Sequence, residues 1–169
     1  MARFEWDRIG DISIGRENLG LEMPVAIYRL LMQCMTDELI DRYGKDKSDD
    51  IIRSIGFRAG FALGETITAD TPDFNGFIAG SQRKLREYKI GILRVESVND
   101  ENRRIILTVS EDLDCSGMPV RGDTVCKFDE GMISGLLYKA TGWQYSVMEV
   151  DCWSAGDRTC RFEASALAT

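Results

Sequence analysis

Histidine is absent from the 169 residues of the chain. Without an imidazole there can be no Ser-His-Asp triad and no Cys-His dyad. A zinc site containing histidine and the usual proximal ligand of haem are excluded for the same reason. Any metal site must therefore use thiolates, carboxylates or other donors.

Positive charge and long apolar runs are also scarce. The chain carries 21 Lys and Arg against 28 Asp and Glu, a formal charge of −7, and no basic run exceeds two residues. Binding to nucleic acid needs clustered cations, so we expect no nucleic-acid partner. No apolar stretch approaches the roughly 20 residues of a membrane span, and the acidic residues after Met1 do not resemble a signal peptide. We therefore expect a cytoplasmic protein with no membrane span.

The apolar pattern predicts one α+β domain over residues 1–169, because 44% apolar content is enough for a core. The predicted order is three helices, a β-hairpin, a helix and a second β-hairpin, with helices packed on a small antiparallel sheet. We predict helices over residues 24–44, 48–66, 71–88 and 124–141, and strands over 90–98, 103–110, 145–153 and 158–164.

Local signals refine these helices. Ser48 and Thr71 are predicted N-caps, and Cys34 lies on an apolar stripe that predicts a core position. Gly56, Gly60 and Gly64 recur at intervals of four. Each glycine costs about 1 kcal/mol of helix propensity relative to alanine, so their repetition favours close helix packing. A ligand wall and a dimer face are the alternatives.

Three of the five cysteines can approach one another through local geometry. Cys126 is predicted in the first turn of a helix, where the dipole favours a thiolate. Cys152 and Cys160 would face each other if the connection between them closes a hairpin. Strand alternation puts Glu149 on the opposite face from Cys152, so both can bind one metal only if a β-bulge intervenes.

These four residues suit zinc, which accepts thiolates and carboxylates in a tetrahedral set. Cys126, Glu149, Cys152 and Cys160 would close a structural Zn²⁺ site with no position for water. Reduced cysteines that pack as small apolar side chains are one alternative. Cys115 is an alternative fourth ligand; it would make the site all-cysteine and able to hold an iron–sulfur cluster.

The segments CKFDEGMISG (126–135), EVDC (149–152) and GDRTCRF (156–162) resemble the 4-vinyl reductase domain family. Residues 20–31 and 51–67 also match its layout, so the resemblance covers about residues 20–165. The fold of that family is related to transport-particle subunits of vesicle tethering and to the sensory domains of aromatic-responsive regulators. The resemblance implies a stand-alone member that binds a small molecule and is often dimeric. It also implies zinc held by Cys126, Glu149, Cys152 and Cys160.

The function expected from this resemblance is that of a sensor or accessory protein for a hydrophobic, aromatic or tetrapyrrole-like ligand. Phenol sensors of the family hold the hydroxyl with a histidine and a tryptophan, so the missing histidine argues against phenol. Ligand pockets are largely apolar. The predicted pocket is formed by Phe61, Phe77, Leu107, Val109, Phe128, Met132 and Trp143.

Two other functions are considered. A vinyl reductase-type oxidoreductase in chlorophyll or tetrapyrrole metabolism would need a separate electron donor, because the sequence has no G-x-G-x-x-G after a strand and no P-loop. A protein-interaction scaffold is the other alternative. A homodimer is compatible with all three functions.

Overall fold

The computed structural model describes residues 4–68 and 73–167. The chain divides into two compact units, Met1–Asp49 and Asp50–Thr169, and the boundary falls within α3 (Lys45–Thr68). Each unit is described by itself. The single domain over residues 1–169 stays a prediction. No helix among the described residues combines the length and apolarity that a membrane span requires.

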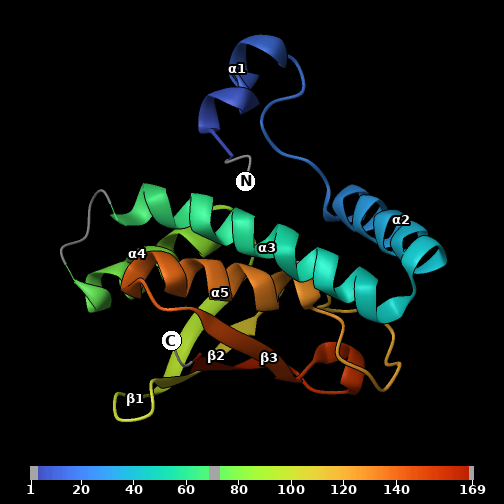
Figure 1. The fold of residues 1–169 in the computed structure, drawn as a ribbon. Helices are drawn as coiled ribbons and strands as arrows, with labels where there is room; N and C mark the ends of the chain where they lie inside the picture. The colour runs from blue at the N-terminus through green and yellow to red at the C-terminus, as the bar shows by residue number, and fades with distance from the viewer. Residues whose placement is uncertain (1–3, 69–72, 168–169) are drawn as a thin grey trace. The chain divides into compact units, whose positions relative to one another are not determined.

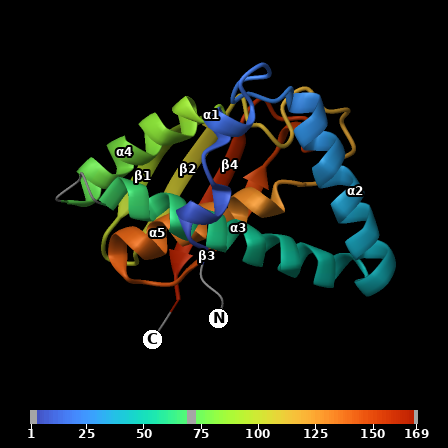
Figure 2. The same cartoon turned by 90° about the horizontal axis from the view of Figure 1, so that it is seen from above.

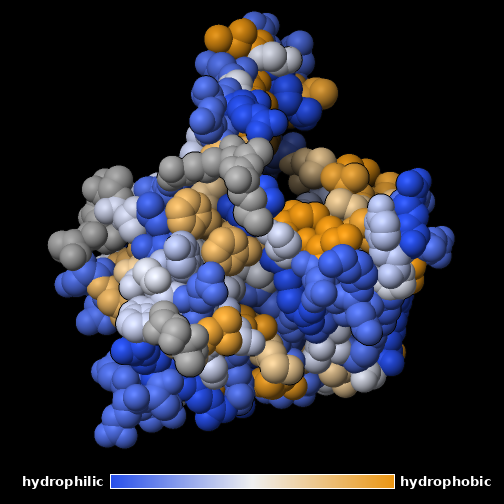
Figure 3. Space-filling model, viewed as in Figure 1, coloured by the Kyte–Doolittle hydropathy of each residue, from blue (hydrophilic) through white to orange (hydrophobic). Residues whose placement is uncertain are grey.

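The first unit contains η1 (Trp6–Ile9), α1 (Ile12–Gly15), α2 (Val25–Tyr43) and the start of α3. No residue of α2 is buried, and Cys34 is exposed. The predicted helix is therefore confirmed, but the predicted core position of Cys34 is wrong. A unit of this size has too little chain to enclose every apolar stripe. Leu30 and Leu31 are 60% and 64% exposed, and apolar side chains lie at the surface of this segment in the space-filling view (Figure 3).

The second unit is built on a four-stranded antiparallel sheet (Figures 1 and 2). In spatial order its strands are β1 (Ile92–Asn99), β2 (Arg104–Ser110), β4 (Cys160–Ala166) and β3 (Tyr145–Asp151). Alternate residues of β2 and β4 are buried, as expected for a sheet with one covered face. The two predicted hairpins are therefore confirmed.

Helices cover one face of this sheet. α4 (Phe74–Glu87) contacts β1, and α5 (Lys127–Thr141) contacts β3. A short 3-10 helix, η2 (Trp153–Ala155), lies between β3 and β4. The predicted α+β class and the predicted order of the major elements are confirmed, with the short α1 and the two 3-10 helices in addition.

The predicted helix starts need correction. Ser48 is not an N-cap, because α3 begins at Lys45 and the Ser48 N–H already donates to the carbonyl of Gly44. The predicted cap Thr71 lies outside the described residues. Asp73 is the N-cap of α4 and accepts the N–H of Gly76. Cys126 is itself the N-cap of α5 rather than a residue of its first turn.

The glycines of α3 allow its backbone to lie against that of α5. A Cβ at Gly56 would lie 2.1 Å from the carbonyl oxygen of Phe128, and one at Gly60 would lie 2.0 Å from that of Met132. Gly131 and Gly135 are equally close to α3. The predicted close helix packing is confirmed. It also means that Gly56 and Gly60 face protein backbone where the alternative had a ligand.

Candidate metal centre

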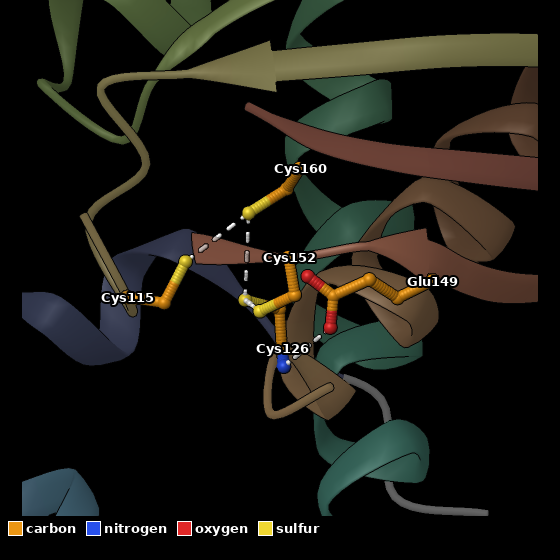
Figure 4. Close-up of side chains that lie close together, drawn as sticks. All are labelled: Cys115, Cys126, Glu149, Cys152 and Cys160. Carbon is orange, nitrogen blue, oxygen red and sulfur yellow. Dashed lines mark hydrogen bonds between the residues drawn. The ribbon is translucent and has the colours of Figure 1, made fainter. Parts of the chain in front are cut away.

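Five metal-binding side chains meet at one end of the sheet (Figure 4). Their donor atoms all lie within 4.8 Å of one another, and every one of the residues is buried. They come from the segment between β2 and α5, the N-cap of α5, β3, the residue after β3 and the first residue of β4. In that order they are Cys115, Cys126, Glu149, Cys152 and Cys160.

The spacing of three of these sulfur atoms matches a tetrahedral zinc site. The Sγ atom of Cys126 lies 3.9 Å from that of Cys152 and 3.9 Å from that of Cys160. Two thiolates on one zinc, each about 2.3 Å from it, are about 3.8 Å apart at the tetrahedral angle. The Sγ atoms of Cys115 and Cys160 are closer together, at 3.1 Å.

Glu149 reaches the thiols because β3 is irregular. The pairing of β3 with β4 shifts register between Glu149 and Asp151, which confirms the predicted bulge. Glu149 Oε2 accepts the N–H of Cys126 at 2.9 Å. Glu149 Oε1 is buried and has no hydrogen-bond partner among the described residues. A metal ion would satisfy this oxygen, so the donor set fits the zinc that the sequence predicts.

The electrostatics of the cluster also favour a cation. Burial raises the pKa of Glu149 to about 8. Hydrogen bonds from the neighbouring thiols, that of Cys115 first, lower the pKa of Cys152 and raise the pKa of Cys126. These groups cannot all ionise together, because like charges at such distances repel one another. A divalent metal would offset that repulsion and allow several thiolates to coexist.

Further buried groups hold the ligand backbone in place. Glu130, at the start of α5, accepts the N–H of Glu149 at 3.0 Å and the ammonium of Lys127 at 2.9 Å. Asp157 accepts the N–H of Cys152 at 3.0 Å. These hydrogen bonds fix the bulge of β3 and the turn before β4, and so they fix the positions of two donors.

A pair of buried carboxyl groups lies next to the thiols. Asp112 Oδ1 accepts the N–H groups of Asp114 and Cys115, at 2.7 and 3.1 Å, and so holds the turn that carries Cys115. Asp112 also interacts with Asp129, which is 3% exposed on α5. Sequence reasoning missed both residues. The spacing of Asp112 before Cys115 is a turn signal that could have indicated the first.

The residues predicted to line a ligand pocket divide between core and periphery. Phe77, Leu107, Val109 and Met132 belong to the hydrophobic core and are each 2% exposed. Phe128 and Trp143 pack against that core. Phe61 instead contacts the ring of Tyr138.

Two cavities in the described part of the chain have other linings. One, of about 470 Å³, lies beside β3 and includes Arg53, Ser134 and Tyr145. The other, of about 420 Å³, includes Arg94, Thr108 and Arg161. Neither contains a predicted pocket residue, so the predicted pocket stays a prediction.

The class of domain follows from this fold and from a match to a known family. Residues 105–166 match the sequence model of the 4-vinyl reductase domain. The matched region contains all five donors, from Cys115 to Cys160. The resemblance to this family is therefore confirmed for the part of the chain that carries the candidate metal centre.

Two uncharacterized proteins of Methanocaldococcus jannaschii are similar in sequence. MJ0150 is 30% identical over 111 residues, which are 66% of this chain and 63% of that protein. MJ1642 is 32% identical over 78 residues, which are 46% of each. The chain thus spans less than two thirds of the length of both relatives.

Solved structures show the same fold. A vinyl-4-reductase family protein from Methanocaldococcus jannaschii matches with a TM-score of 0.64, 19% identity and 99% coverage of both chains. The phenol-responsive sensory domain of the transcription activator PoxR, solved with phenol, matches with a TM-score of 0.65 and 15% identity over 87% of this chain and 76% of that one. A trafficking protein particle complex subunit 3 from Naegleria fowleri, covalently bound to palmitic acid, matches with a TM-score of 0.58 and 12% identity over 85% and 97%. The predicted relationship to sensory domains and transport-particle subunits is confirmed at the level of the fold.

Proposed function

We propose that the protein is a zinc-containing domain that binds a small hydrophobic molecule and acts as a sensor or accessory protein. Zinc is held by Cys126, Glu149, Cys152 and Cys160, and Cys115 is the alternative ligand. The observation that carries this proposal is the buried cluster of five donor atoms within 4.8 Å, with one carboxylate oxygen that has no hydrogen-bond partner among the described residues. The zinc is structural, because four protein ligands leave no position for water.

The metal has a defined task in this arrangement. Its ligands come from the N-cap of α5, from β3 and its end, and from the first residue of β4. Zinc therefore fastens the β3–β4 hairpin to the helix that covers it. Metal binding and folding of this end of the sheet are then one equilibrium, because the unfolded chain has no preformed site.

Metal analysis of untagged, reduced protein tests the zinc site. We expect about one zinc per chain in the wild type, and loss of zinc together with a lower melting temperature in Cys152→Ser. Cys34→Ser is the matched control, because Cys34 is exposed and outside the cluster, and it should keep both the metal and the stability. A fully folded, metal-free wild type, or a brown protein that contains iron, would contradict the proposal.

Several observations support a hydrophobic ligand. The fold is that of a sensory domain solved with phenol and of a trafficking subunit bound to palmitic acid. We propose that the ligand enters between the helices and the sheet, where Phe77, Leu107 and Val109 lie, and that the core opens to admit it. An aromatic or tetrapyrrole-like compound suits these side chains. Without histidine, the chain lacks the group that holds a phenol hydroxyl in the sensors it resembles.

The remaining expectations stay predictions. A homodimer would cover part of the apolar surface of α2, where Leu30 and Leu31 are exposed. A cytoplasmic location suits a site of reduced thiols. A vinyl reductase activity would require a separate electron donor.

A further inference from the structure

We infer that Cys115 and Cys160 form a redox pair whose oxidation to a disulfide releases the zinc. This inference rests on the proposed zinc site and adds a mode of regulation to it. It follows from the presence of five donors where a tetrahedral zinc uses four. When Cys126, Glu149, Cys152 and Cys160 hold the metal, Cys115 is a thiol in contact with one of the ligands.

The distances separate this pair from the other thiols. Cys126 lies 3.9 Å from both Cys152 and Cys160, which is the spacing of two sulfurs that share one zinc. The Sγ atoms of Cys115 and Cys160 are 3.1 Å apart, about 1 Å more than a disulfide bond. In Figure 4 the side chain of Cys115 points at Cys160 from the side opposite Glu149. The geometry thus favours one particular pair for bond formation.

The backbone at Cys115 can supply the small shift that a disulfide needs. Cys115 lies between β2 and α5, in a stretch with no regular helix or strand. It is held there by a turn in which its own N–H donates to Asp112 and its carbonyl accepts the N–H of Met118. Cys160, by contrast, begins β4 and is paired with Val109. Movement of the turn by about 1 Å would close the bond without disturbing the sheet.

The oxidant in this step is a peroxide, and the atoms and electrons balance. Hydrogen peroxide oxidises the Cys115 thiolate to a sulfenic acid and releases hydroxide. The Cys160 thiolate then attacks the sulfenic sulfur, forms the S–S bond and expels a second hydroxide. The two sulfurs lose two electrons in total, and the peroxide gains them. Zinc loses Cys160 as a ligand, keeps only three, and dissociates.

The sequence allows the disulfide to be located by mass spectrometry. Trypsin would place each of the four clustered cysteines on a different peptide: 105–121, 122–127, 140–158 and 159–161. The experiment starts from zinc-loaded protein carrying Cys34→Ser, which removes the exposed thiol. Hydrogen peroxide is added, and zinc release is followed with a chromogenic chelator. Free thiols are then alkylated in denaturant, and the peptides are analysed without reduction.

We expect peptides 105–121 and 159–161 to be joined, and zinc release to rise in step with that product. Dithiothreitol should reverse the bond and restore zinc binding. Cys115→Ser should bind zinc at the wild-type stoichiometry and release it several-fold more slowly in peroxide, because it lacks the thiol that the peroxide oxidises first.

Three results would overturn the inference. These are a disulfide between Cys126 and Cys152, equal release rates in Cys115→Ser and its parent, and loss of zinc from Cys115→Ser before any oxidation, which would make Cys115 a ligand. Failure of the zinc proposal looks different. In that case the parent protein binds no zinc, and the peptide map still shows whether Cys115 and Cys160 pair.

Discussion

Asp129 illustrates how burial changes the chemistry of single residues near the cluster. Burial, and then the charge of Asp112, raise the pKa of Asp129 well above its ordinary value of 3.8. Burial also raises the pKa of Asp112. Two carboxylates this close cannot both be charged without cost, so the pair favours sharing a proton. The neutral form of Asp129 is therefore the one that the fold stabilises.

A pH dependence of stability follows from this shift. Between 3.8 and the raised pKa, folded protein binds more protons at Asp129 than unfolded protein does, so stability falls as pH rises through that window. Asp129→Asn keeps the shape of the neutral acid and removes the titration. In zinc-free, reduced protein, we expect urea unfolding from about pH 5 to about pH 8 to show a shallower loss of stability in this variant than in wild type.

The exposed Asp100→Asn is the control for that series and should follow the wild-type curve. Parallel curves for Asp129→Asn and wild type would show that the carboxyl group of Asp129 does not contribute to the pH dependence.

At the residue scale, the sequence supports the donors better than their surroundings. Spacing alone proposed Cys126, Glu149, Cys152 and Cys160, because a hairpin and a helix start determine where those positions lie. Glu149 was correctly expected to need a bulge. Asp129 and Glu130 could not be found in this way. The chain has 28 acidic residues, and nothing in the sequence shows which of them tertiary packing will bury.

At the element scale, helix α3 is defined by its contact with α5. The contact is between backbones, since ideal Cβ positions at Gly60 and Gly131 lie only 2.0 Å from carbonyl oxygens of the opposite helix. The repeat of glycines at four-residue intervals predicted this packing from sequence, because helix geometry puts such positions on one face.

Gly60→Ala should separate the two helices. The added methyl group would meet the Met132 carbonyl, which cannot move without moving α5, so we expect a loss of about 1–3 kcal/mol in chemical denaturation. Gly64→Ala is the matched control in the same helix. Its methyl group meets the flexible side chain of Lys139, and the gain in helix propensity, about 1 kcal/mol, offsets the contact. Equal stabilities for the two variants would show that the close approach is not required.

Helix α2 shows where element prediction from sequence ends. Its apolar periodicity correctly located a helix within a residue of Val25 and Tyr43, yet the same pattern wrongly placed Cys34 in a core. Periodicity reports which side chains share a face. It does not report whether any other element covers that face, which depends on tertiary or quaternary contacts.

At the scale of the whole molecule, zinc and ligand would act on the same end of the second unit. The candidate zinc ligands Cys126 and Cys160 belong to the same core cluster as Leu107 and Val109, which the proposed ligand would contact. A ligand that enters this core must replace side-chain contacts with its own. A core that zinc holds together can open and close around a ligand without losing the hairpin.

A thermal shift series tests ligand binding in zinc-loaded protein. We expect a saturable rise in melting temperature with an aromatic hydrocarbon, an alkane or a porphyrin, and none with phenol. A ligand at 100 times its dissociation constant adds about 2.7 kcal/mol to stability. Leu107→Ala removes a side chain from the predicted pocket and should change the rise, measured against the melting temperature of the ligand-free variant. It should itself cost about 2–5 kcal/mol.

Thr108→Ala is the neighbouring control, because Thr108 lies on the other face of β2 and lines the outer cavity instead. Its response to ligand should equal that of wild type. If Leu107→Ala and Thr108→Ala respond alike, the ligand does not enter between the helices and the sheet. If no compound raises the melting temperature, the binding function fails, and the protein-interaction scaffold becomes the better explanation of a fold that it shares with a trafficking complex subunit.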